Sequence, residues 1–513
     1  MLLHDYLIRS ATLFPEKTAL WCGETSYTYL DLFRRVKACA DLFLTLGLRR
    51  GDRVALWLPN SAEQVVGLFA TWMAGGCAVP IGATTPLERC LRQIDHCGAS
   101  FVVAPDARMT ALATQPAQAI PSSAIMDVYA WPGHVSHHAG DAGTPPRRSE
   151  PPDAIIDLDL AAIIYTSGSS GTPKGVTHTH RSIDCATEGI NGYLRNGSED
   201  VILSVLQLNF SYGLLQLLGT FRTSGTLVLE TGIGYPYEIV RQFSRHRVTG
   251  FAGAPTIWAM LLQLTGIGPE NFASVGYITN AAAAMPGPFV PRLAELFSNA
   301  KIFLMHGMTE CLRTGFLPPE EALTNPASIG RAMQNVDLWI ADESGNRLGP
   351  GEIGELVIQG STLMAGYWND INATDQVVRP GRYPWERCLY SGDMFRMDEK
   401  GYFYFVARKD DIIKSRGEKV SPVEVEAVIY QLPAVRECRI IGVPDELLGN
   451  RVRAEVVLRE GGELDEKQLK AHCSKHLEPY KVPQDVAFVA GLPKTEGGKI
   501  VRKQRSEGPV ILP

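Results

Sequence analysis

Short runs of β-forming residues alternate with helical patterns along most of this chain, and this alternation limits the folds open to it. A strand pattern over residues 52–60 precedes a helical pattern over 61–74, and the same order recurs at 226–230 and 236–246. Such alternation predicts an α/β fold with largely parallel sheets. At 513 residues the chain is too long for one simple core, so we expect two or more domains.

The pattern changes in the last third of the chain. From about residue 352, short strands separated by turns predict a small β-barrel. After about residue 410, the strand and helix patterns follow an order that predicts a compact βαββαβ-like unit. These patterns lie at residues 422–433, 435–445, 451–460, 466–477 and 485–491.

Charge and cysteine content exclude several classes of protein. The net charge is −6, so nothing draws the whole chain to nucleic acid or to an anionic membrane. The ten cysteines form no CxxC pair and no His/Cys cluster at zinc spacing. Such scattered cysteines are typical of reduced thiols, so we expect a cytoplasmic protein.

Neither the N-terminus nor the most apolar stretch is expected to enter a membrane. The first turns carry His4, Asp5 and Arg9 and no cleavage site of small residues, which argues against a signal peptide. Residues 65–84 are uncharged and mostly apolar, but two glycines and a proline divide them. A membrane helix needs about 20 unbroken residues, so we expect a buried helix, a turn and a strand here.

The strongest chemical signal is the segment IIYTSGSSGTPKGVTHTH, residues 163–180. An apolar strand runs directly into a loop of small residues, where Gly168 and Gly171 let the backbone approach a ligand closely. Backbone N–H groups, hydroxyls and one cation are what a polyphosphate requires. The side chains concerned are Thr166, Ser167, Ser169, Ser170, Thr172 and Lys174. The segment lacks the GxxxxGK[ST] pattern, so a P-loop NTPase is not indicated.

This segment resembles the phosphate-binding loop of the adenylate-forming superfamily, which includes acyl-CoA synthetases, peptide-synthetase adenylation domains and luciferases. Four further motifs follow in the family's order and extend the resemblance over nearly the whole chain. They are Gly307-Met308-Thr309-Glu310, Tyr390-Ser391-Gly392-Asp393, the segment around Arg408 and Asp410, and PKTEGGKIVRKQ, which contains Lys499. Each string is weak evidence alone, but five in order are not a coincidence.

The resemblance implies a fold and a reaction. The fold has a large N-terminal domain, residues 1–409, of two αβαβα-like subdomains plus a small distorted β-barrel, and a small mobile α+β C-terminal domain, residues 410–513. The reaction activates a carboxylic acid with ATP and Mg²⁺, giving an acyl-adenylate and pyrophosphate, and then transfers the acyl group.

The resemblance also implies residue roles. Thr309 meets phosphate, Glu310 helps to hold magnesium, and Asp393 and Arg408 bind the ribose. Lys499 is the catalytic lysine, and donors around Thr166 assist it in neutralising charge on the phosphorus. Asp410 is the hinge between the domains, and the loop with Arg416 and Gly417 serves the transfer step. His306 stands where the family usually has a tyrosine that stacks on adenine, and an imidazole can still stack.

Fewer residues in the sequence indicate the acyl substrate. Amino-acid-activating relatives commonly place Asp directly after the aromatic residue that aligns with Phe210, whereas this chain has Ser211. A buried ammonium without a counter-charge is costly, so α-amino acids are disfavoured. The predicted substrate residues are Phe210, Ser211, Tyr212, Leu214 and Ala282, and Trp258 is placed in the same pocket. They favour a fatty, alicyclic or aryl acid, although each could equally belong to a core.

The acyl acceptor stays open at this point. Coenzyme A is the first choice, and Arg416, Lys414 and Lys419 are plausible contacts for it. A carrier-protein phosphopantetheine is the second choice and an amine, giving an amide, the third. A luciferase-like oxidation is remote. A catalytically inactive adenylate-binding regulator is disfavoured because Lys174, Glu310, Asp393 and Lys499 are all present.

Overall fold

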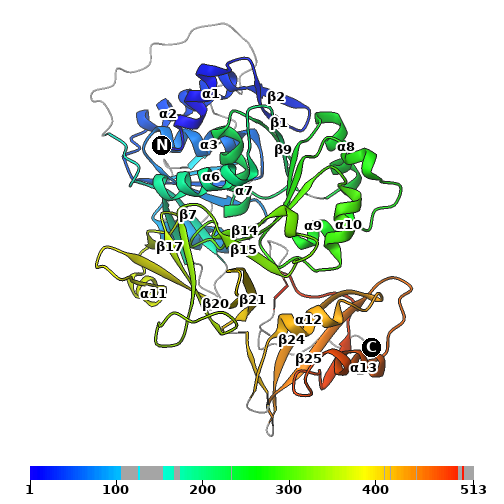
Figure 1. Cartoon of the computed structure of the whole chain (residues 1–513). Coiled ribbons are helices and arrows are strands. Elements are labelled where there is room, and N and C mark those ends of the chain that lie inside the picture. The colour runs from blue at the N-terminus through cyan, green and yellow to red at the C-terminus, as the bar shows by residue number, and fades with distance from the viewer. Residues whose placement is uncertain are drawn as a thin grey trace.

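The computed structural model describes residues 1–105, 125–127, 154–166, 174–232, 234–409, 411–415, 418–445, 448–494 and 500–501. A large N-terminal part holds two extended sheets flanked by helices, and a small C-terminal part lies beneath it in the view of Figure 1. This mixed α/β arrangement confirms the predicted fold class.

The first sheet has seven strands in the order β18-β8-β7-β4-β3-β5-β6. Strands β3 to β7 run parallel, and β8 returns antiparallel to β7. The strands are β3 (Arg53–Leu58), β4 (Cys77–Gly82), β5 (Phe101–Ala104), β6 (Ile125–Asp127), β7 (Leu160–Thr166), β8 (Lys174–Thr179) and β18 (Gly366–Tyr367).

The helix before β4 confirms the expectation for the apolar stretch. Helix α3 (Ala62–Met73) begins where the Ser61 side chain accepts a hydrogen bond from the Gln64 N–H, which satisfies one of the free donors of a helix N-terminus. It ends before the two glycines, and β4 follows. No helix among the described residues is both long and apolar enough to cross a bilayer.

The second sheet joins a parallel half to an antiparallel half. Its strands follow the order β16-β17-β20-β21-β15-β14-β13-β12-β11-β9-β10-β1-β2, with β19 beside β20. From β13 to β1 the pairings are parallel. These strands are β13 (Lys301–His306), β12 (Tyr277–Asn280), β11 (Gly250–Gly253), β9 (Val201–Ser204), β10 (Thr226–Leu229) and β1 (Thr18–Cys22), with β2 (Thr25–Thr28) antiparallel at the edge.

The antiparallel half occupies the place where the sequence predicted a small barrel. Pairing of β14 with β13 joins these strands to the parallel half. They are β14 (Gly315–Leu317), β15 (Ser328–Ala332), β16 (Val336–Ala341), β17 (Ile353–Gly360), β19 (Val378–Pro380), β20 (Arg387–Met397) and β21 (Phe403–Arg408), with helix α11 (Ile371–Val377) nearby.

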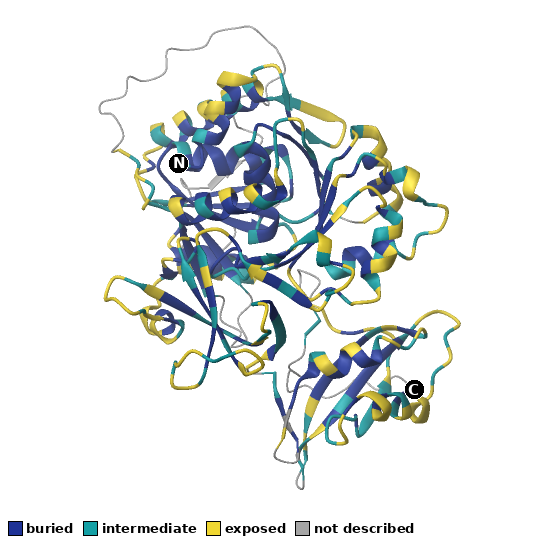
Figure 2. Ribbon diagram, viewed as in Figure 1, coloured by how far each residue is buried: buried dark blue, intermediate teal, exposed yellow. Residues whose placement is uncertain are grey.

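Helices cover both faces of the parallel strands, and Figure 2 shows that these strands are almost wholly buried. Burial on both faces is what a parallel sheet requires. The helices of the large part are α1 (Asp5–Leu13), α2 (Tyr29–Thr45), α4 (Leu87–Cys97), α6 (His180–Leu194), α7 (Ser211–Arg222), α8 (Pro236–His246), α9 (Pro255–Leu261) and α10 (Phe289–Leu296). Helix α8 matches the pattern predicted for residues 236–246.

Alternate residues of the parallel strands point into two different cores. Ile202 and Ala252 belong to one cluster together with Tyr212 of α7. Their neighbours Leu203 and Phe251 belong to a second cluster, which also contains Trp258. The prediction that Trp258 shares a pocket with Tyr212 is therefore wrong, because the period-2 alternation of the strands separates the two.

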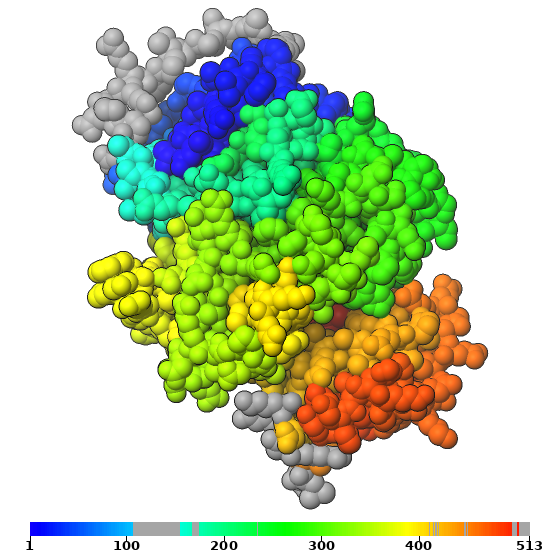
Figure 3. Space-filling model, viewed as in Figure 1, coloured from blue at the N-terminus to red at the C-terminus, as the bar shows by residue number. Residues whose placement is uncertain are grey.

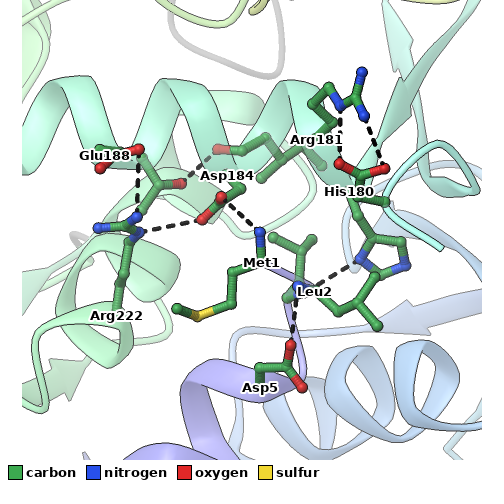
Figure 4. A network of polar contacts seen from close by, with 12 residues as sticks. Met1, Leu2, Asp5, His180, Arg181, Asp184, Glu188 and Arg222 are labelled. Carbon is green, nitrogen blue, oxygen red and sulfur yellow. Dashed lines mark hydrogen bonds and ion pairs between the residues drawn. The ribbon is translucent and has the colours of Figure 1, made fainter. Parts of the chain in front are cut away.

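The N-terminal helix is fixed to α6 and α7 by a polar network around Asp184 (Figure 4). The Tyr6 hydroxyl donates to Asp184 at 2.6 Å, and Arg222 Nε lies 3.2 Å from the same carboxylate. The Met1 ammonium group lies 3.0 Å from its other oxygen. These contacts hold the pKa of Asp184 below its usual range, although burial alone acts in the opposite direction.

The small C-terminal part has its own core and a three-stranded sheet in the order β24-β25-β26. It contains β22 (Ile413–Ser415), β23 (Glu418–Val420), α12 (Pro422–Ile429), β24 (Val435–Asp445), β25 (Gly449–Leu458), α13 (Glu466–His476) and β26 (Asp485–Phe488). The first strands form a separate hairpin, which differs from a single βαββαβ sheet. In Figure 3 this part, orange to red, lies against the lower side of the large part.

Candidate active site

The β7–β8 hairpin places the predicted phosphate loop at one end of the first sheet. Thr166 is the last residue of β7 and pairs directly with Lys174, the first residue of β8. The predicted loop residues Ser167, Gly168, Ser169, Ser170, Gly171 and Thr172 lie between them, outside the described residues. The ladder thus sets Thr166 and Lys174 opposite each other at the base of the loop.

A tight turn after β13 carries the Gly-Met-Thr-Glu motif. A Cβ atom on Gly307 would lie 2.4 Å from the Leu312 carbonyl oxygen, so only glycine fits beneath the turn. Leu312 has a φ of 61°, in the left-handed region, and the Arg313 N–H bonds to the Cys311 carbonyl at 2.6 Å. Left-handed backbone at a leucine costs on the order of 1–3 kcal/mol and is concentrated at functional sites.

Glu310 is joined to the phosphate-loop hairpin through a tyrosine. The Tyr367 hydroxyl of β18 donates to Glu310 Oε1 at 2.9 Å, and Lys174 Nζ lies 4.8 Å from the centre of the Tyr367 ring. Burial and the neighbouring Glu310 carboxylate raise the pKa of Tyr367 well above its usual value, so this hydroxyl keeps its proton. Tyr367 was not singled out from the sequence, because it is distant from both groups along the chain.

Asp393 and Arg408 face each other across the ladder of β20 and β21. Arg408 Nε lies 2.7 Å from Asp393 Oδ1, an ion pair that is not aligned as a hydrogen bond. Asp393 is 3% exposed, and this oxygen has no hydrogen-bond partner in the described part of the chain. Its second oxygen lies 3.8 Å from His306 Nε2. A buried acceptor without a donor fits a ligand with hydroxyl groups.

His306 is fixed at the end of β13. Its Nδ1 lies 2.8 Å from the Thr314 hydroxyl, and its ring packs edge-on against Phe395 at 5.2 Å between centres. The turn therefore folds back, and His306 at its start contacts Thr314 at its end. The predicted partners His306, Asp393 and Arg408 come together here.

His178 supports the same turn from below. Its side chain is fully buried, and Nε2 donates to the Thr309 carbonyl oxygen at 2.7 Å while Nδ1 lies 3.1 Å from the Ser182 hydroxyl. Burial lowers the pKa of His178 to about 4, so the ring is neutral near pH 7. Sequence reasoning missed this contact, which joins β8 to a turn more than a hundred residues away.

The predicted acyl-substrate residues gather around the start of α7, with one exception. Phe210 and Ser211 are partly buried at the first turn, and Tyr212 donates its hydroxyl to Thr279. Leu214, 1% exposed, belongs to the main core. Ala282 follows β12 with a φ of 74° and is exposed.

Arg313 is a further residue that the sequence did not single out. It is 2% exposed, and its guanidinium carbon lies 5.2 Å from the centre of the Tyr212 ring. Glu310 and Arg313 thus lie in the same turn, but their side chains contact different elements. The Glu310 side chain contacts β18, and the Arg313 side chain contacts α7. The available signal was a basic residue three positions after the Gly-Met-Thr-Glu motif.

Besides the phosphate-loop residues, four further predicted functional residues lie outside the described residues: Asp410, Arg416, Gly417 and Lys499. Their roles stay predictions.

Comparisons with known proteins agree with this geometry. The model of the AMP-binding enzyme family matches residues 7–368, and that of the AMP-binding enzyme C-terminal domain matches residues 424–499. The chain is 30% identical to a long-chain-fatty-acid–CoA ligase of Bacillus subtilis (strain 168), over 98% of this chain and 94% of that protein. It is 31% identical to a feruloyl-CoA synthase of an Amycolatopsis species, over 98% and 97%.

A solved structure shares the fold. The o-succinylbenzoate CoA synthetase from Bacillus subtilis, in complex with its acyl-adenylate intermediate, superposes with a TM-score of 0.84 at 26% identity and covers 98% of both chains. The fold and site thus define an AMP-forming acid–thiol ligase. The chain belongs to the AMP-binding enzyme family.

Proposed function

We propose that this enzyme activates a carboxylic acid with ATP and passes the acyl group to coenzyme A. One observation carries the proposal: two polar clusters lie close to each other at the end of β13 and the turn that follows it, which carry His306 and Glu310. The first is Lys174, Tyr367 and Glu310, and the second is Asp393, Arg408 and His306. They are close enough that the positive charge of Arg408 acts to lower the pKa of Tyr367, against the larger effect of burial.

The second cluster suits the nucleoside end of ATP. Asp393 offers two carboxylate oxygens to a vicinal diol, and Oδ1 lacks a hydrogen-bond donor. Arg408 holds this carboxylate in place while remaining half exposed. His306 lies beside Asp393 with its ring orientation fixed by Thr314, which supports its proposed contact with adenine.

The first cluster suits the phosphates and a magnesium ion. The described residues contain no group of three or more His, Cys, Asp or Glu side chains able to enclose a metal. Glu310 with substrate oxygens and water is the coordination that Mg²⁺ commonly has beside phosphates. Magnesium would supply charge neutralisation at the phosphates. Tyr367 orients Glu310, and Lys174 adds a positive charge nearby.

The chemistry divides between the two domains, for which we propose residues 1–409 and 410–513. In the first step an oxygen of the acid attacks the α-phosphorus and pyrophosphate leaves. We assign Lys499 and the donors around Thr166 to stabilising the charge that develops on that phosphorus. In the second step the thiol attacks the acyl carbon and AMP leaves, with rotation near Asp410 presenting the loop of Arg416 and Gly417.

Coenzyme A is the proposed acceptor because the relatives above are named for it and because Lys414, Arg416 and Lys419 are suited to its phosphates. For the acid, Ser211 at the first turn of α7 supplies no carboxylate for an α-ammonium group. This favours acids without an α-amino group.

Acid-dependent exchange of labelled pyrophosphate into ATP tests the first step. A panel of fatty, alicyclic and aryl acids should include one that supports exchange, and its α-amino counterpart should be at least about tenfold worse in kcat/KM. Mass spectrometry then tests the second step, with coenzyme A, a phosphopantetheinylated carrier protein or an amino-acid pool as acceptor. Acyl-CoA should accumulate fastest. A dominant amide or a loaded carrier would replace coenzyme A and leave the first step intact.

A further inference from the structure

The acyl side of the site contains a buried charge that no residue in the described part of the chain neutralises. Arg313 is 2% exposed. Its Nε atom has no hydrogen-bond partner, and across the described ranges no carboxylate forms an ion pair with the guanidinium. An arginine side chain does not lose its proton in proteins, so the positive charge persists in this position.

The titratable groups that face Arg313 are neutral. Burial raises the pKa of Tyr193 to about 12, and it also raises the pKa of Tyr212. In both cases the charge of Arg313 acts in the opposite direction, which places it in their electrostatic surroundings. The Tyr193 hydroxyl bonds to Met305 Sδ at 2.9 Å, and the Tyr212 hydroxyl bonds to Thr279.

The carboxylates of the nucleotide side are occupied elsewhere. Glu310 accepts from Tyr367, and Asp393 lies between Arg408 and His306. The face of the Tyr212 ring gives Arg313 a cation–π contact, which is worth far less than the hydration lost on burial. A buried cation whose protein surroundings are complete would normally have an anionic partner.

The position of Arg313 indicates where that partner comes from. Its backbone continues the turn that carries Glu310, whereas its side chain reaches Tyr212 on α7, beside the predicted substrate residues Phe210 and Ser211. The guanidinium is therefore directed away from Glu310 and toward the acyl side. The strained backbone at Leu312 and the close packing of Gly307 hold the turn in this direction.

We propose that Arg313 binds a second carboxylate on the substrate, so that the preferred acid is a dicarboxylic acid activated at one end and held by Arg313 at the other. This deepens the proposed function and rests on it. It adds a second charged group to the expected fatty, alicyclic or aryl acid. Apolar surroundings strengthen the attraction between the two charges. The planar guanidinium can donate two parallel hydrogen bonds to a carboxylate.

The test compares three acids of one carbon skeleton: the dicarboxylic acid, its monomethyl ester and the corresponding monocarboxylic acid. Aliphatic and aryl sets are tried at several lengths, and kcat/KM is measured from pyrophosphate release. The wild-type enzyme should prefer the best diacid over its ester by about 100-fold, since the ester leaves Arg313 without a partner. Equal rates, or a preference for the ester or the monoacid, overturn the proposal without a variant being needed.

Two variants then assign the preference to Arg313. Arg313→Met should reduce kcat/KM for the diacid by about 100-fold and leave the ester and monoacid within about threefold. Arg313→Lys keeps the positive charge but cannot donate two parallel hydrogen bonds, so it should retain part of the preference for the diacid. A uniform loss for all three acids means that Arg313 contacts the reacting carboxylate or only supports the fold, and it overturns the proposal.

Arg331 provides a matched control. It also lies over a tyrosine ring, Tyr402, at 4.4 Å, but it is exposed and donates to the Lys400 carbonyl. Arg331→Met should leave the diacid preference unchanged. The diacid alone should raise the melting temperature of the wild type and not of Arg313→Met. If no acid supports exchange at all, the proposed function fails; if only monoacids do, this inference alone fails.

Discussion

The large and the small domain use buried charge differently. In the large domain Asp393 lies within β20 and Glu310 lies in the turn after β13, and each carboxylate keeps capacity for a ligand beside its protein contacts. In the small domain Arg439 and Glu455 pair at 2.7 Å between β24 and β25, both about 10% exposed. The carboxylates of the large domain can therefore bind a ligand, whereas the ion pair of the small domain links two strands of its sheet. On the proposed roles, the small domain supplies Lys499 and the transfer residues Arg416 and Gly417, so variants of the two domains should affect different steps.

The largest effect is expected for the small domain's proposed catalytic lysine. Lys499→Ala should slow acid-dependent ATP–pyrophosphate exchange by about 10²–10³, the usual loss for one donor to a developing charge. Transfer from a pre-formed acyl-adenylate should change far less. Lys494→Ala is the control, because Lys494 forms a surface pair with Glu437 at 2.8 Å. Equal losses in both half-reactions would contradict the division of labour.

A binding defect is expected when the large domain's prepared carboxylate is removed. Asp393→Ala should raise KM for ATP by about 10–100-fold, since a hydrogen bond to a charged group is worth about 1.5–3 kcal/mol. The acid's KM should change little. Asp337→Ala is the control, because Asp337 is 58% exposed and pairs with Arg347 on the surface. An unchanged KM for ATP would show that Asp393 does not contact the nucleotide.

Restricting the proposed hinge should separate the two steps. Proline fixes φ near −65°, so Asp410→Pro should leave pyrophosphate exchange near wild type and reduce overall thioester formation by about tenfold or more. Asp410→Ala keeps the backbone free and should behave as wild type. If the proline variant turns over like the wild type, Asp410 is not the pivot. The proposed domain boundary at residue 410 is then also wrong.

The smallest effect concerns stability at low pH. The folded-state pKa of His178, about 4, lies below its unfolded value of 6.5, so the unfolded state binds more protons as the pH falls. The stability contribution is present above pH 6.5 and is lost as the pH falls toward 4. At pH 5.5 the loss should be about 1 kcal/mol. Melting temperatures at pH 7.5 and 5.5 should therefore differ less in His178→Gln. If the wild type and His178→Gln show the same difference in melting temperature, another group causes the acid sensitivity. One such group is His180, which burial also keeps neutral.

Much of the fold could be predicted because it follows from local pattern. Apolar runs of four to six residues gave the buried strands, and helix α8 matches the predicted range of residues 236–246. The break at Gly75 and Gly76 correctly separated α3 from β4. The placement of Trp258 failed because periodicity does not say which face of a sheet a following helix covers.

The site was predictable only where its residues form motifs. Thr166 and Lys174, Glu310, and Asp393 with Arg408 were found through short strings. The structure pairs Thr166 with Lys174 and Asp393 with Arg408 across neighbouring strands, and Tyr367 joins Glu310 to Lys174. Tyr367 and Arg313 lie outside the motifs, and His178, near the end of the phosphate-loop segment, was given no role from the sequence. Each acts through a contact with a residue distant in the sequence, and such contacts exist only once the strands are paired.

The sequence by itself therefore determined the class of fold, the order of the elements and the family, because hydrophobic period and short motifs are local properties of the chain. Only the tertiary structure decided which charges are matched. Asp393 and Arg408 meet because β20 and β21 pair in one register. Arg313 has no anionic partner among the described residues because its turn directs it toward α7. Charge balance in a buried site depends on distances and solvent exclusion, which arise when separate segments pack together.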